Sequence, residues 1–192
     1  AIDIFTDSYP KKFLHQLVSS QLDMDRMDYL IRDSFFTGVA EGIVGIDRII
    51  KTLNVYENQL VCESKAIYSV EKFIIARRLM YWQVYLHKAA VAAEYMVVNI
   101  LKSARQLTEG GVTVPILSTL CKNVIRRKLL KAHLHNEPVE ESRIQELKES
   151  LSKRQGFTEE ETGYFVFTGE LVNQAYFQNS KEPILIWFKS GE

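Results

Sequence analysis

The chain has 192 residues and a formal net charge of zero, because 24 lysines and arginines balance 24 aspartates and glutamates. Hydrophobic residues make up 46% of it and charged residues 25%, the usual mixture of a globular protein. This composition excludes a disordered polar chain, a protein that binds nucleic acid through bulk positive charge and, with two cysteines, a disulfide framework or a closed zinc site.

The first part of the chain, from Pro10 to Leu53, is predicted to be helical. Apolar residues recur at helical spacing after Pro10, and a second helix is predicted over about Met24 to Phe36. Glycines at positions 38, 42 and 45 interrupt the pattern before a short helix over 47–53. An alternating stretch over 58–63 predicts a short strand or hairpin arm.

The longest predicted helical region runs from Val70 to about Glu109, without proline or glycine. Ser69 is expected to cap it, and Gly110 and Gly111 end it. A single rod of this length would span about 60 Å at 1.5 Å per residue. One long helix and two packed helices with a bend both agree with the pattern.

The last part of the chain, residues 113–192, is predicted to be a small α+β region. Strands are expected over 128–135, 164–167 and 184–188, and an amphipathic helix over 139–155 that ends at Gly156. Four aromatic residues are expected in its core: Phe165, Phe167, Trp187 and Phe188. The fold class is therefore mainly α, with a helical domain over 1–112 followed by this α+β region.

Polar side chains share one side of the second predicted helix, within an arc of about 100°. They are Asp25, Arg26, Tyr29 and Asp33. The residues expected on the opposite, core-facing side are Met27, Leu30 and Ile31. A carboxylate can bind a metal ion and a guanidinium can hold a phosphate, but the spacing alone favours a solvated face with local ion pairs.

A second stripe lies on the long helical region, at positions i, i+4, i+8 and i+11. It consists of Arg77, Tyr81, Tyr85 and Lys88. Two cations together with two phenols suit a phosphorylated, sugar-bearing ligand. An amphipathic helix with packed tyrosines and outward-reaching cations fits the spacing equally well.

Both stripes lie in strings that resemble a known family. The string S-S-Q-L-D-M-D-R-M-D-Y-L-I-R-D-S-F-F-T-G-V resembles the region around the last metal-binding aspartate of HD-superfamily phosphohydrolases, most closely the deoxynucleoside triphosphate triphosphohydrolase branch. The string A-R-R-L-M-Y-W-Q-V-Y-L-H-K resembles the substrate-contacting helix of that branch, and R-R-K-L-L-K resembles the entry to its C-terminal region. The resemblance implies an HD-type helical body that cleaves a deoxynucleoside triphosphate into a deoxynucleoside and triphosphate with a divalent metal ion.

The resemblance also implies roles for individual residues. Asp25 would be the metal ligand and catalytic residue, and Arg26 and Arg77 would meet the substrate phosphates. Tyr29, Asp33 and Tyr85 would contact the deoxyribose. Tyr81 and Lys88 would complete the substrate-binding stripe.

The chain departs from the family pattern because it contains no His-Asp dipeptide. We therefore expect an incomplete chain that lacks the H…HD ligands and is inactive by itself. Leu86 stands where some relatives have a polar residue toward the base, which leaves base preference open. We also expect residues to be missing between Gly111 and Ile116, where relatives carry a further helical stretch.

Residues 122–131 form a basic run without acidic residues, which contains Lys122, Arg126, Arg127, Lys128 and Lys131. It could bind phosphate, a regulatory nucleotide or nucleic acid, but pairing with Glu137, Glu140 and Glu141 is slightly favoured. His133 and His135 are expected to be exposed residues rather than half of a metal site.

We expect a nucleotide substrate and a homo-oligomer. No apolar run reaches the roughly 18 residues of a membrane span, so a cytoplasmic protein without membrane contact is expected. The alternatives are an HD phosphodiesterase or phosphomonoesterase, and a non-catalytic regulator that binds nucleotides or nucleic acid.

Overall fold

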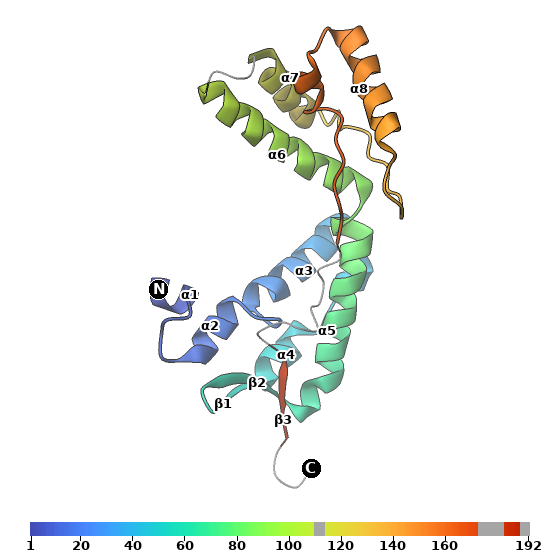
Figure 1. The fold of residues 1–192 in the computed structure, drawn as a ribbon. Helices are drawn as coiled ribbons and strands as arrows, with labels where there is room; N and C mark the ends of the chain where they lie inside the picture. Colours follow the sequence, from blue (N-terminus) through green and yellow to red (C-terminus); the bar gives the residue numbers. More distant parts are fainter. Residues whose placement is uncertain (110–113, 173–182, 189–192) are drawn as a thin grey trace. The chain divides into compact units, whose positions relative to one another are not determined.

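The computed structural model describes residues 1–109, 114–172 and 183–188, and these are mainly helical, as predicted (Figure 1). The chain divides into two compact units. Among the described residues, the first consists of residues 1–85 and 183–188, and the second of the residues between 86 and 172. The predicted domain boundary at residues 112 and 113 and the first part of the expected gap after Gly111 lie outside the described residues.

The helices of the first unit lie close to the predicted ranges, except for a first short helix that was not predicted. They are α1 (Ile2–Phe5), α2 (Lys12–Val18), α3 (Met24–Thr37), α4 (Ile46–Thr52) and α5 (Ile67–Met80), with short 3-10 turns at Ala40–Gly42 and Ser64–Ala66. The side chain of Asp23 begins α3 by accepting a hydrogen bond of 2.7 Å from the backbone amide of Arg26. Gly38 ends the helix in the left-handed conformation, at φ 71°. Both ends of α3 are therefore set by residues that adjoin the helix in the sequence.

The core of the first unit forms where α3, α4 and α5 meet. Its largest fully buried side chains include Met27, Leu30, Ile49 and Phe73. Met27 and Leu30 confirm the predicted core face of α3, but Ile31 is 42% exposed, so its assignment to the core was wrong. A helix offers only a stripe to its neighbours, and Ile31 lies at the edge of that stripe.

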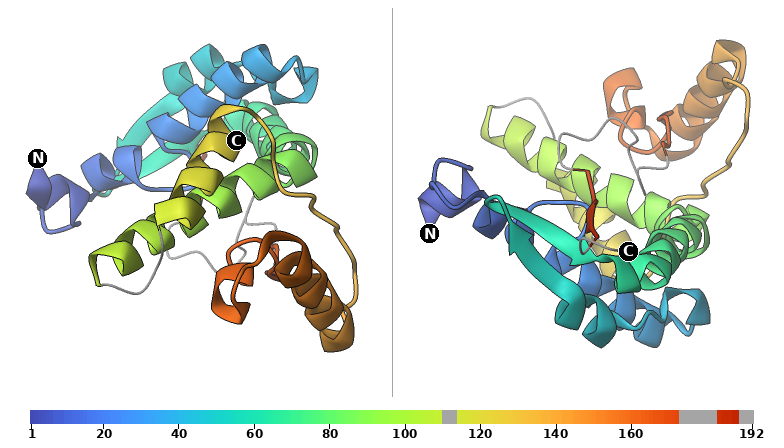
Figure 2. Two further views of the ribbon diagram at one scale, coloured as in Figure 1. Left: turned by 90° about the horizontal axis from the view of Figure 1, so that it is seen from above. Right: turned by 90° about the horizontal axis from the view of Figure 1, so that it is seen from below.

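A small sheet completes this unit, with β1 (Leu53–Tyr56) antiparallel to β2 (Gln59–Glu63) and β2 parallel to β3 (Leu185–Trp187) (Figure 2). The hairpin turn uses two residues at positive φ, Glu57 and Asn58, which suits the twist of paired strands. The predicted strands at 58–63 and 184–188 are thus confirmed.

The position of β3 corrects the expected core of the C-terminal region. Trp187 lies on β3 and packs against Tyr56 of β1, with ring centroids 6.3 Å apart. Phe188 follows the strand and is exposed. Both residues therefore belong to the first unit, since β2 supplies the pairing edge for β3.

The long helical region is interrupted, so it forms two helices and not the single long helix that was the other alternative. After α5 the chain forms a π-helical turn, Tyr81–Tyr85, and α6 (Lys88–Thr108) begins after Leu86 and His87. The ring nitrogen Nδ1 of His87 accepts a hydrogen bond of 3.3 Å from the amide of Ala89 and so caps α6. The predicted cap at Ser69 was wrong, because α5 already begins at Ile67.

The second unit contains α6, α7 (Val114–Ile125), α8 (Glu141–Gln155) and α9 (Glu159–Thr162), and α6 packs against α7 (Figure 2). The predicted helix ending at Gly156 is confirmed, with that glycine at φ 72°. The core contains Ile116, Leu120 and Tyr164, with Phe165 packed against them as expected.

The strands predicted over 128–135 and 164–167 were wrong. Residues 128–135 are irregular and 164–166 form a turn. The amide of Leu130 contacts the sulfur of Met96 at 3.3 Å instead of a strand carbonyl. An alternating pattern yields a strand only where another segment offers a pairing edge, and no described residue of this unit is in a strand.

Candidate functional site

Residues of the two predicted stripes meet within the first unit. The hydroxyl of Tyr85 donates a hydrogen bond of 2.8 Å to Oδ2 of Asp33 on α3. The Tyr85 ring also contacts Tyr29 and Tyr81 edge to face, with centroids 5.9 and 5.2 Å apart. We refer to Tyr29, Asp33, Arg77, Tyr81 and Tyr85 as the tyrosine cluster.

Arg77 is the cation of this cluster, and its side chain is held inside the unit. The residue is 5% exposed. Its Nη1 donates a hydrogen bond of 3.1 Å to Oε1 of Gln21, and its guanidinium carbon lies 5.8 Å from the centroid of the Tyr81 ring. These contacts hold a planar, permanently charged group in a fixed orientation, the type of group that recognises phosphate or carboxylate.

The environment keeps the phenols of Tyr29 and Tyr85 protonated. Burial raises the pKa of Tyr85 well above its usual range, and its hydrogen bond to the Asp33 carboxylate raises that pKa further. Burial also raises the pKa of Tyr29, although the nearby Arg77 charge opposes this shift. At neutral pH both hydroxyls are hydrogen-bond donors, which suits contacts with sugar or phosphate oxygens.

The other two predicted residues of α3 lie at its beginning. Asp25 is exposed in the first turn, and it has no hydrogen bond or ion pair with other described residues. Arg26 contacts the side chain of Asp23 and the backbone oxygen of Ser20 through Nη1. The Arg26 guanidinium therefore supports the buried Asp23 cap.

Lys88 begins α6 and is exposed. It belongs to the second unit, whereas the other seven predicted site residues belong to the first. The structure therefore assembles Tyr29, Asp33, Arg77, Tyr81 and Tyr85 within the first unit, and Lys88 lies in the second.

Two features of the site escaped the sequence reasoning. Gln21 fixes the guanidinium of Arg77, although its position just before α3 gave no periodic signal. The π-helical turn over Tyr81–Tyr85 widens the helix at the cluster, and such turns are frequent at functional sites. Tyr81 and Tyr85 were placed on one stripe from α-helical spacing, and that spacing did not reveal that the turn between them is π-helical.

The described residues do not fit a complete metal centre. They contain no group of three or more histidine, cysteine, aspartate or glutamate side chains that could hold an ion. Asp25 supplies one exposed carboxylate, which fits one ligand of such a site and not the whole site.

The basic run lies at the end of α7 and beyond it. Lys122, Arg126, Arg127, Lys128 and Lys131 are exposed, and none of them pairs with a described carboxylate, so the expected pairing with Glu137, Glu140 and Glu141 is not formed. His133 and His135 are exposed as expected, with their rings stacked 6.3 Å apart. Among the described residues, no helix is long and apolar enough to cross a membrane.

Residues 44–119 match the model of the HD associated region family. The structure resembles the crystal structure of a phosphohydrolase from Bacteroides thetaiotaomicron, with a TM-score of 0.75 and 42% sequence identity over 85% of this chain and 53% of that one. An uncharacterized protein of Bacillus subtilis, YwfO, is 39% identical over 109 residues, which cover 57% of this chain and 25% of the relative.

The name of a more distant relative states an activity. The deoxynucleoside triphosphate triphosphohydrolase SAMHD1 homolog of Dictyostelium discoideum is 27% identical over 99 residues, which cover 50% of this chain and 19% of that protein. The chain thus spans about a quarter or less of these two curated relatives and about half of the solved phosphohydrolase. Together the family match and the similarities support the relationship of this chain to the HD-type phosphohydrolase superfamily.

Proposed function

We propose that the intact protein is an HD-type phosphohydrolase that acts on nucleotides, most specifically by cleaving a deoxynucleoside triphosphate into a deoxynucleoside and triphosphate. The observation that carries this proposal is the convergence of Tyr29 and Asp33 from α3 with Arg77 from the end of α5 and Tyr85 from the π-helical turn. The similarity to a solved phosphohydrolase supports the reaction class, and the name of the distant Dictyostelium relative supports the substrate class.

The cluster offers complementary chemistry for such a substrate. Arg77 supplies a fixed positive charge for a phosphate, in the fork geometry that favours two parallel hydrogen bonds. The protonated hydroxyl of Tyr29 can donate a hydrogen bond to a substrate oxygen, and the Asp33 carboxylate, which already accepts one from Tyr85, can accept another from a sugar hydroxyl. Closely packed rings limit the space beside a sugar, so a 2′-hydroxyl can be discriminated by crowding.

A divalent metal ion would polarise the phosphoryl oxygen and lower the pKa of an attacking water. In this proposal Asp25 contributes one ligand, since its carboxylate is exposed and has no described partner. The guanidinium of Arg26, which contacts the side chain of Asp23, would lie by the substrate phosphates. Asp23 remains the helix cap and takes no part in the chemistry.

The test is a substrate panel on the intact protein with the products separated by ion-exchange chromatography. Release of triphosphate from deoxynucleoside triphosphates supports the proposal. Release of orthophosphate, or of a nucleoside monophosphate, would instead support the alternative HD phosphomonoesterase or phosphodiesterase.

The matched variants are Asp25→Ala and Asp28→Ala. Both carboxylates are exposed on α3, but Asp28 forms an ion pair of 2.7 Å with Arg32. Asp25→Ala should lower kcat/KM by about 100-fold or more, because loss of even an outer partner of a metal site costs 10–100-fold. Asp28→Ala should leave turnover unchanged, and equal activity of the two variants would contradict the role of Asp25.

Arg77→Lys tests the substrate side of the proposal. The lysine keeps the charge but loses the planar fork and the bond to Gln21. We expect KM to rise by about tenfold, the effect of one charge-assisted hydrogen bond, without loss of bound metal. An unchanged KM would return Arg77 to a structural role.

A regulator without turnover is the second candidate, and the exposed basic run favours it. These five cations have no described acidic partner and provide a surface for a regulatory nucleotide or nucleic acid. Binding of a nucleotide without any product in the panel above would support this candidate. A homo-oligomeric state is part of both proposals and is measured by sedimentation.

A further inference from the structure

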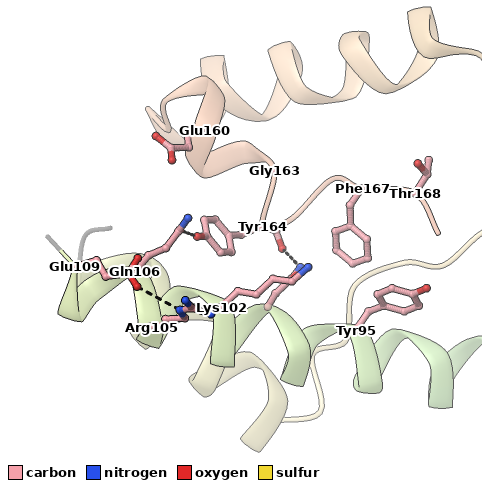
Figure 3. Close-up of a pocket in the computed structure, with 11 residues that line it drawn as sticks. Tyr95, Lys102, Arg105, Gln106, Glu109, Glu160, Gly163, Tyr164, Phe167 and Thr168 are labelled. Carbon is pink, nitrogen blue, oxygen red and sulfur yellow. Dashed lines mark hydrogen bonds and ion pairs between the residues drawn. The ribbon is translucent and has the colours of Figure 1, made fainter. Parts of the chain in front are cut away.

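A pocket in the second unit lies apart from the residues assigned to the proposed reaction. It is formed between α6 and the turn that follows α9 (Figure 3). Its volume is about 550 Å³, within the range of small-molecule sites. Tyr95 and Lys102 line it from α6, and Tyr164 and Phe167 line it from the opposite side.

Aromatic rings form one end of this pocket. Tyr95 and Phe167 lie with their centroids 5.4 Å apart and an angle of 34° between the ring planes. The Tyr95 hydroxyl approaches the backbone so closely that a Cβ at Gly169 would lie 2.3 Å from its oxygen. Glycine at this position therefore permits the ring arrangement, which offers flat apolar surface to a ligand.

The wall of the pocket that contains Tyr164 is held in place by hydrogen bonds to α6. Asn99 is buried and donates a bond of 2.9 Å from Nδ2 to the backbone oxygen of Tyr164. The Tyr164 hydroxyl donates to Oε1 of Gln106. Burial, together with the charge of Glu160, raises the pKa of Tyr164, so its hydroxyl stays protonated. The wall is thus preformed, which reduces the entropy cost of binding.

Among the described charged residues of the pocket, one cation can pair with a ligand without breaking an ion pair of the protein. Arg105 pairs with Glu109, with 3.2 Å between Nε and Oε1. Glu160 lies on α9, and its charge acts on the Tyr164 hydroxyl. The Lys102 side chain has no hydrogen bond or ion pair with any other described residue, although it lines the same pocket. A ligand can therefore gain an ion pair at Lys102 without displacing a protein partner.

We propose that this pocket binds a small planar aromatic anion, with its ring against Tyr95 and Phe167 and its anionic group at Lys102. The ring gains aromatic contact area, and the anion gains a charge-assisted hydrogen bond. The site involves only residues of the second unit, so it does not depend on the proposed hydrolysis.

The probe is 1-naphthalenesulfonate, which combines a flat ring with an anion that a phosphohydrolase does not cleave. Sulfate provides the anion without the ring, and 1-naphthol provides the ring without the anion. Binding to the whole 192-residue chain is followed by amide NMR shifts. We expect saturable shifts centred on residues 95–106 and 163–168, with a Kd of about 1 mM or below, and much weaker effects of sulfate and 1-naphthol.

Lys102→Gln and Lys153→Gln form a matched pair of exposed lysines of the second unit, and Lys153 lies outside the pocket on α8. Lys102→Gln should weaken binding by about tenfold, the effect of one lost ion contact, and Lys153→Gln should not change it. Phe167→Ala should weaken binding of the same probe, and the unperturbed spectrum of each variant verifies its fold.

Three results would overturn the proposal. They are the absence of saturable shifts at about 1 mM probe, shifts centred outside the pocket, and equal affinities of Lys102→Gln and Lys153→Gln. Binding of 1-naphthol as tight as that of the sulfonate would likewise exclude the assigned role of Lys102. None of these results bears on the substrate panel for hydrolysis.

Discussion

Replacement of Tyr85 by phenylalanine removes one hydrogen bond from the tyrosine cluster and retains the ring contacts. The lost bond joins the Tyr85 hydroxyl to Oδ2 of Asp33 over 2.8 Å, and both residues are half-buried. Hydrogen bonds to charged groups contribute about 1.5–3 kcal/mol. Since water still reaches both residues, we expect Tyr85→Phe to lower the free energy of unfolding by about 1–2 kcal/mol.

Tryptophan fluorescence in urea reports on this unit selectively. Both tryptophans of the chain, Trp82 and Trp187, belong to the first unit, and Trp82 lies within the same π-helical turn as Tyr85. The double-mutant cycle of Tyr85→Phe with Asp33→Ala then isolates the pairwise term. Its expected coupling energy is about 1–2 kcal/mol, within the range for residues in direct contact.

Tyr68→Phe is the control, because Tyr68 lies on α5 and is 84% exposed. We expect this control to change stability by less than about 0.5 kcal/mol. A coupling energy below about 0.3 kcal/mol in the Tyr85 and Asp33 cycle would refute the reasoning, because independent sites give values of that size. The hydrogen bond would then contribute nothing to the arrangement of the cluster.

Two further predictions concern the core of the same unit. Gly42→Ala should destabilise it by about 1–3 kcal/mol in urea unfolding, because the added Cβ would lie 2.7 Å from Cβ of Ser34. Gly45→Ala is its control and should be nearly neutral, as nothing lies within 4 Å there, and equal losses would contradict the packing argument. Burial raises the pKa of the Cys62 thiol from 9.0 to about 11, so the protonated thiol contributes to the free energy of unfolding below pH 9, and this contribution is lost as the pH rises toward 11. The loss amounts to about 2–3 kcal/mol; a Cys62→Ala variant should show a shallower decline of stability over this range, and an identical decline would contradict the assignment.

The sequence by itself determined several helices, α3 among them, and one side of the candidate site. The range of α3 was predicted from apolar residues at helical spacing and from the glycines that begin at Gly38. The same spacing placed Tyr29 and Asp33 on one side of the helix. These features were predictable because a helix forms its hydrogen bonds between residues four apart, so its signals are local.

Only the tertiary structure decided which segments meet. The alternating pattern over 128–135 resembles that of a strand but found no pairing edge, whereas Leu185 pairs with Val61 from a distant part of the chain. Likewise, the bond between Tyr85 and Asp33 depends on how α5 packs against α3 and on the π-helical turn at its end. Strand pairing and side-chain convergence depend on distant partners, and the periodicity of one segment carries no information about them.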